Sequence, residues 1–138
     1  MVKKIEIERK PAVALFTTEV GRCFVRRDLL PKAHIHLLSE PYRVRLGKKR
    51  IEIREVGLVL GKIDGLDFDV EADVVDVLDP ADGQRLDAII GSFEMNRWEI
   101  RIDPASGTLD LEGLRRREFT EYWEPLPQRP EAIPPVRR

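Results

Sequence analysis

The chain has 138 residues, of which 42% are hydrophobic and 36% charged, and its 24 basic and 25 acidic residues leave a formal net charge of −1. This length is typical of one domain, and the hydrophobic fraction can form a core, which excludes a globally disordered chain. The near-zero net charge gives no reason to expect a nucleic-acid or membrane-surface protein.

The beginning of the chain carries no targeting signal. Met1 is followed by an alternating Ile and Glu segment rather than an apolar leader, and no stretch approaches the roughly 18 apolar residues of a membrane span. We therefore expect a cytoplasmic protein without a membrane partner. Cys23 is the single cysteine, which excludes an intrachain disulfide.

Apolar and polar residues alternate from Val2 to about Leu111, which predicts strands with one buried face. We expect strands at 2–7, 12–16, 42–46, 51–53, 58–60 and 66–74, with a hairpin turn at 47–50. In the strand at 66–74, the carboxylates of Asp67, Asp69, Glu71 and Asp73 point the same way, which predicts a solvated face.

Helical signal is scarce. The sequence allows one turn at 28–30, a short helix at 91–98 with Ser92 as N-cap, and a loosely periodic helix at 112–124. We therefore predict an all-β fold with a few short helices. Half of the ten prolines lie in residues 125–138, so we expect a β domain at 1–124 followed by an extended or disordered Pro-rich tail.

Two groups of side chains invite a metal interpretation, and we reject both. The acidic run from Asp64 to Asp76 lacks the spacing of a calcium loop, because apolar residues interrupt it with strict alternation. His34 and His36 share one strand face, but a zinc site needs three or four ligands. We predict no metal and no other cofactor.

Nucleophilic catalysis and phosphate binding also lack their usual motifs. Ser92 lacks the second glycine of a G-x-S-x-G elbow, and Cys23 has no local catalytic signature. Basic residues cluster at 43–50 and 115–117. A nucleic-acid site formed by Arg43, Arg45, Lys48, Lys49 and Arg50 would bind in a strongly salt-dependent way. We favour a solvated hairpin there and expect no nucleic-acid partner.

Segments in the second half of the chain follow one another in a recognisable order. These are Val74-Val75-Asp76-Val77, then Asp87-Ala88-Ile89-Ile90-Gly91-Ser92-Phe93-Glu94-Met95, then Trp98-Glu99-Ile100-Arg101-Ile102-Asp103-Pro104 before a Ser106-Gly107 turn. This order resembles the second half of the prokaryotic retropepsin-like aspartic peptidases (clan AA). The resemblance runs from Val13 to Gly107 and implies a small closed acid-protease β-barrel with one or two short helices.

The family's chemistry resides in an Asp-Thr/Ser-Gly-Ala segment after an apolar strand, and the matching segment here is Thr17-Thr18-Glu19-Val20. Thr17 occupies the position of the catalytic aspartate, Thr18 matches the hydroxyl residue, and Glu19 replaces the glycine. Retropepsins use two aspartates, one from each subunit, to activate a water. Because a threonine hydroxyl cannot act alone as the general base, the resemblance implies a degenerate motif.

Two other carboxylates, those of Glu19 and Asp64, are candidates to replace the missing aspartate. Glu19 is displaced by two residues from the expected position, and its side chain stands where the family uses glycine. Asp64 in Ile63-Asp64-Gly65 lies in the turn of the hairpin that follows the flap and lacks the hydroxyl residue.

The resemblance therefore implies a homodimeric peptide-binding or assembly module, a pseudoenzyme without conventional peptidase activity. The alternative is an active hydrolase that uses Glu19 or another carboxylate. By analogy, the dimer interface would include Lys3 to Glu8 and Leu109 to Leu111. The flap that family members fold over the cleft would be Leu46 to Ile53, with Gly47 at its bend.

Overall fold

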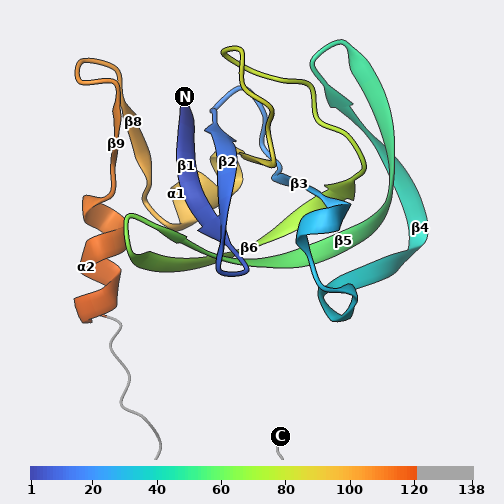
Figure 1. Cartoon of the computed structure of the whole chain (residues 1–138), viewed down its shortest axis with the longest axis horizontal. Coiled ribbons are helices and arrows are strands. Elements are labelled where there is room, and N and C mark those ends of the chain that lie inside the picture. Colours follow the sequence, from blue (N-terminus) through green and yellow to red (C-terminus); the bar gives the residue numbers. More distant parts are fainter. Residues whose placement is uncertain (121–138) are drawn as a thin grey trace, which may run out of the picture.

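Figure 1 shows the computed structural model of the chain, which describes residues 1–120. The strands are β1 (Val2–Ile7), β2 (Lys10–Phe16), β3 (Phe24–Arg26), β4 (Ile35–Leu46), β5 (Lys49–Ile63), β6 (Leu66–Val75), β7 (Ala88–Ile90), β8 (Arg101–Asp103) and β9 (Thr108–Asp110). The helices are the 3-10 turns η1 (Arg27–Leu29) and η2 (Lys32–His34) and the α-helices α1 (Ser92–Arg97) and α2 (Glu112–Thr120).

Seven of the strands form one sheet in the order β1-β2-β7-β3-β6-β5-β4, and β1 also pairs with β5. The second pairing joins Glu6 to Lys62 and Ile7 to Gly61. The strands β1, β2, β7, β3, β6 and β5 therefore form a ring in which each strand pairs with the next. Strand β4 lies outside this ring, with β5 as its partner on one side. Strands β8 and β9 form a separate small sheet, which lies beside α2 on the opposite side of the molecule from β4 (Figure 1).

The core is divided into two clusters by the sheet. Ala12, Ala14 and Phe16 of β2 face the larger cluster, to which α1 contributes Met95 and α2 contributes Leu114. The intervening residues of β2 pack against the smaller cluster, which consists of Phe24, Ile53, Val75, Leu78, Leu86 and Ile89. Strand β2 therefore packs on both faces, as the fully apolar run at 12–16 predicts.

Strand β5 joins two regions that the sequence predicts as separate strands. It pairs with β4 from Lys49 to Gly57 and with β6 from Val56 to Ile63. Its second half is thus part of the ring, whereas its first half leaves the ring together with β4. We call residues 42–53 the flap hairpin; it rises on the right of Figure 1 and turns at Gly47, whose φ of 65° suits a glycine.

Several sequence predictions are wrong in detail. Asp73 is 1% exposed and does not belong to a solvated face, although Asp67 and Glu71 are exposed. His34 ends a 3-10 turn and does not share a strand face with His36. The side chain of Ser92 makes no capping hydrogen bond, and Gly91 is the N-cap of α1.

Helix α2 begins at Glu112 as predicted, and η1 covers most of the turn expected at 28–30. The predicted continuation to 124 and the Pro-rich tail at 125–138 lie outside the described residues. None of the helices within residues 1–120 combines the length and the apolar character that crossing a bilayer requires.

Candidate functional site

The loop that follows β2 lies beside the end of β7. The two strands are parallel and pair Phe16 with Ile90, so the residues that follow them emerge together. The amide of Thr17 donates to the carbonyl of Ile90 at 3.1 Å, and the Thr17 Oγ1 accepts from the amide of Glu19 at 3.1 Å. The loop that carries the predicted motif is thereby tied to the strand that ends in Gly91.

Helix α1 holds the second half of this loop. The amide of Ser92 donates to the carbonyl of Val20 at 2.8 Å, and the amide of Phe93 donates to the carbonyl of Gly21 at 3.0 Å. A Cβ on Gly91 would lie 2.2 Å from the carbonyl oxygen of Arg22. Only glycine fits this approach, because the obstacle is the backbone of the loop.

The three motif residues at the start of the loop, Thr17, Thr18 and Glu19, carry two hydroxyls and one carboxylate. Thr17 is half-buried, whereas Thr18 and Glu19 are exposed. Among these three residues only Glu19 can accept a proton near neutral pH. Asp64 does not belong to this loop: it lies in the turn between β5 and β6, where its carboxylate contacts Lys3 at 3.2 Å.

The end of the loop carries an ion pair that sequence reasoning missed, in which Asp73 is buried and Arg22 is half exposed. The Asp73 carboxylate on β6 accepts from Arg22 Nε at 2.6 Å and from an Arg22 terminal nitrogen at 2.7 Å. It also accepts from the Tyr42 hydroxyl on β4 at 2.6 Å. Arg22 donates to the Tyr42 hydroxyl as well, and its guanidinium lies 4.8 Å from the centre of the Tyr42 ring. This cluster connects the loop, the body and the strand that leads into the flap hairpin.

The cluster changes the protonation of its members. The hydrogen bonds and charge of Asp73 raise the pKa of Arg22 above its ordinary value. Burial, followed by the hydrogen bond to Asp73, raises the pKa of Tyr42 to about 12. Both residues therefore keep their protons through the neutral range, and the tyrosine acts as a donor to the carboxylate rather than as a base.

Cys23 is buried directly behind the loop, with 2% of its surface exposed. Its sulfur accepts from the amide of Gly91 at 3.5 Å, and burial raises the pKa of the thiol to about 12. A thiol in this state is a poor nucleophile, because the thiolate is the reactive form. The residue packs in the larger core cluster, which agrees with the absence of a catalytic signature around it.

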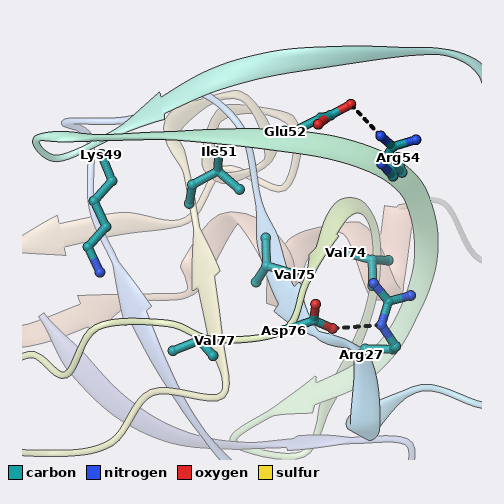
Figure 2. A pocket seen from close by; sticks show the side chains of 9 residues that line it. All are labelled: Arg27, Lys49, Ile51, Glu52, Arg54, Val74, Val75, Asp76 and Val77. Atoms are coloured by element: carbon teal, nitrogen blue, oxygen red, sulfur yellow. Dashed lines mark hydrogen bonds and ion pairs between the residues drawn. The ribbon is translucent and has the colours of Figure 1, made fainter.

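A cavity of about 440 Å³ lies where the flap hairpin leaves the body. Figure 2 shows Lys49 and Ile51 extending from β5 toward the segment that carries Val75 and Val77. Ion pairs link the two sides: Lys49 contacts Asp79 at 2.9 Å, and Arg27 contacts both Asp76 and Glu55. The cavity borders a strand edge without a partner in the described chain, since β5 begins to pair with β6 only at Val56.

Among the side chains that the structure describes, in residues 1–116, no group of three or more His, Cys, Asp or Glu could hold a metal ion. The His34 ring instead contacts the Glu8 carboxylate at 3.1 Å, and both side chains are largely buried.

No protein-family model and no curated protein matches the chain. Among solved structures, it is similar to the retroviral protease-like domain of Ddi1 from Leishmania major, with a TM-score of 0.54 and 16% identity. That match covers 80% of this chain and 86% of the domain. A second match is the foamy viral protease-reverse transcriptase solved with an RNA/DNA hybrid, with a TM-score of 0.51 and 9% identity. It covers 71% of this chain but only 12% of the viral one.

These likenesses establish the fold. The chain has a retropepsin-like fold that consists mostly of strands with few short helices, as predicted from the order of its segments. The assignment of Thr17 to the catalytic position stays a prediction, as does the relationship to the prokaryotic branch.

Substitution of Gly91 by alanine should destabilise the protein. The new Cβ would meet the carbonyl oxygens of Arg22 and Gly21, which α1 and the loop hold in place. We expect the free energy of unfolding to fall by about 1–3 kcal/mol in urea denaturation. Ser92→Ala is the matched control, and because its hydroxyl caps nothing, a change within about 0.5 kcal/mol is expected. Equal effects of the two substitutions would contradict the close approach.

Removal of the Asp73 carboxylate should be more damaging than removal of an exposed one on the same strand. Asp73→Ala leaves the Arg22 guanidinium and the Tyr42 hydroxyl without their acceptor, for an expected loss of about 1–3 kcal/mol, because the half-exposed guanidinium can still be hydrated. The control Asp67→Ala removes a side chain that is 78% exposed and 3.6 Å from Lys62, for an expected loss of about 0–1 kcal/mol. Similar losses in chemical denaturation would refute the role of the buried cluster.

Stability should fall in alkali because of Cys23 and Tyr42. In the unfolded chain these groups have ordinary pKa values of 9.0 and 10.0, whereas in the folded protein both values rise to about 12. Above pH 9.0 the unfolded state therefore loses protons that the folded state keeps, so the free energy of unfolding decreases toward pH 12. The free energy of unfolding, measured by chemical denaturation at a series of pH values in this range, should depend less steeply on pH in the double variant Cys23→Ala/Tyr42→Phe. If the double variant lost stability with pH as steeply as the wild type, the alkaline destabilisation could not be assigned to Cys23 and Tyr42.

Proposed function

We propose that this protein is a retropepsin-like pseudoenzyme that forms a homodimer and binds an extended peptide or protein segment without cleaving it as an aspartic peptidase. The observation that carries the proposal is the loop after β2. Its backbone is fixed by Ile90, Ser92 and Phe93, yet Thr17 provides a hydroxyl where the mechanism needs a carboxylate. An ordered loop with the wrong functional group favours binding over catalysis.

The open strand edges support the dimer. Strand β1 pairs with β2 along its whole length but with β5 only at Glu6 and Ile7, so its first half offers an edge to a second copy. Strand β9 pairs with β8 on one side. These are the segments that the resemblance assigns to the interface. We propose that they associate edge to edge, as strands in a shared sheet do.

The cavity beneath the flap hairpin supports peptide binding. It combines an unpaired edge of β5 with apolar side chains from Ile51, Val75 and Val77. An extended peptide could add to that edge through its backbone and place alternate side chains against the apolar wall. Such binding requires no catalytic carboxylate. We propose the cytoplasm as the location of this activity.

The alternative is a hydrolase that uses Glu19. The exposed carboxylate of Glu19 in the same loop supports this alternative, because a dimer would bring two such loops together. The amide of Glu19 donates to the Thr17 hydroxyl, and this hydrogen bond fixes the backbone position from which the Glu19 side chain extends.

Incubation with an unstructured protein distinguishes the two functions. Over about pH 3–8, the range in which carboxylate dyads operate, the wild-type protein is expected to leave the substrate intact. Glu19→Gln should behave identically, and Asp67→Asn, which neutralises an exposed carboxylate on β6, serves as the matched control. Cleavage is followed by gel electrophoresis and mass spectrometry. Cleavage by the wild type that is lost in Glu19→Gln would establish the hydrolase and reject the pseudoenzyme.

A further inference from the structure

The outer face of the flap hairpin carries cations that the rest of the described chain does not neutralise. Arg43 and Arg45 on β4 and Arg50 on β5 are exposed, with Lys48 in the turn. None of these four residues forms an ion pair with another residue between 1 and 116, the part of the chain whose side chains the structure describes. Lys49, by contrast, points toward the cavity and pairs with Asp79 (Figure 2).

The pairing of the strands increases this imbalance. Arg45 lies directly opposite Arg50, and like charges in that position destabilise a hairpin. Arg43 lies opposite Glu52, but the Glu52 carboxylate contacts Arg54 at 3.0 Å. An acidic partner placed beside Arg43 and Arg45 would remove an unfavourable interaction that the isolated hairpin retains.

The same arginines provide backbone groups for such a partner. Leu46 and Lys49 flank a two-residue turn that begins with glycine, so they form the first hydrogen-bonded pair of the hairpin. Pairs alternate in antiparallel strands, so the amides and carbonyls of Arg43 and Arg45 point away from β5. Within the described residues β4 is the last strand of its sheet, which leaves these groups at a free edge.

We propose that the free edge of β4 at Tyr42 to Leu46 binds an acidic, extended protein segment as an additional strand. Acidic side chains of the segment would lie opposite Arg43 and Arg45 on the outer face. The residue between them would lie opposite Val44, whose side chain belongs to the half-buried inner face. The preferred sequence therefore alternates acidic and apolar residues. The register shift between Leu37 and Tyr42, together with Pro41, ends the usable edge on the other side.

A protein segment fits this surface better than a nucleic acid does. Single-stranded nucleic acids bind to basic grooves that also present aromatic rings for stacking, and the outer face of the flap hairpin carries none. Tyr42 turns its ring to Arg22 and packs against the smaller core cluster. The exposed Glu52 on this face would also repel phosphates. The inference does not depend on the cavity beneath the flap hairpin, because that cavity borders the other edge, on β5.

Titration with a synthetic peptide tests the proposal. The probe is a fluorescent peptide of about ten residues that alternates Glu and Val, which matches the strand period. Fluorescence anisotropy with the full chain should show binding that weakens as salt increases. Arg43→Glu/Arg45→Glu should weaken binding by at least about tenfold, because two attractive cross-strand pairs become repulsive. Arg43→Lys/Arg45→Lys keeps the charges and should retain binding.

The matched control for charge is Lys10→Glu/Lys32→Glu, which makes the same change in net charge on exposed residues of β2 and η2. It should bind the peptide like the wild type. Hydrogen exchange distinguishes strand pairing from association by charge alone. The amides of Arg43 and Arg45 should become protected when the peptide binds, whereas the amide of Val44, which already bonds to β5, should change little.

Three results would overturn the proposal. The first is equal binding of an alternating Lys and Val peptide, and the second is unchanged affinity in Arg43→Glu/Arg45→Glu. The third is tighter binding of an oligothymidylate of about 20 nucleotides without protection of the β4 edge, which would assign the surface to a nucleic acid. Cleavage of substrate by Glu19, or failure of the cavity beneath the flap hairpin to bind peptide, would leave these outcomes unaffected.

Discussion

The carboxylate of Asp73 is the point at which the loop after β2, the body of the sheet and the strand leading to the flap hairpin meet. A buried charge is tolerated only when it is paired and fully hydrogen-bonded. Asp73 therefore requires Arg22 and Tyr42 in fixed positions, and these residues come from two other elements. The amide of Asp73 adds a bond of 2.8 Å to the carbonyl of Cys23. One side chain thus fixes Arg22 at the end of the loop and Tyr42 at the point where β4 enters the flap hairpin.

This constraint and the one at Gly91 converge on Arg22. Its side chain is held by Asp73, and its carbonyl oxygen occupies the space that a side chain at 91 would need. Between Phe16 and Arg22 the loop is therefore fixed at both ends, with the α1 amides bonded to its middle. These contacts are made by the backbone and by Arg22, and the Thr17 hydroxyl adds one bond inside the loop, from the amide of Glu19.

The sequence predicts most strands because alternation reports which side chains are buried. It succeeds for Leu66 to Val74 and for the apolar run at 12–16, where both faces pack. It fails at Asp73 because alternation places this residue on the same face as Asp67 and Glu71. Arg22 of the loop after β2 and Tyr42 of β4, both distant in sequence, hydrogen-bond to Asp73 and help to cover that end of the strand. The beginning of β4 at Ile35 is missed for a similar reason, since a register shift and Pro41 interrupt its pattern.

The two predicted strands at 51–53 and 58–60 are one strand, and this difference has a physical consequence. Because β5 is continuous, the flap hairpin is a direct extension of the ring and not a separate loop. A hairpin of two strands is marginal in water on its own. Here its inner face packs on the smaller core cluster through Tyr42, Val44 and Ile51, while Lys49 contacts Asp79 across the cavity. Both of its edges stay unpaired within the described residues, so an additional strand on either edge would stiffen the hairpin without displacing an existing one. On our proposal, the arginines on β4 make that edge selective for acidic segments, whereas the apolar wall beside β5 would favour apolar side chains.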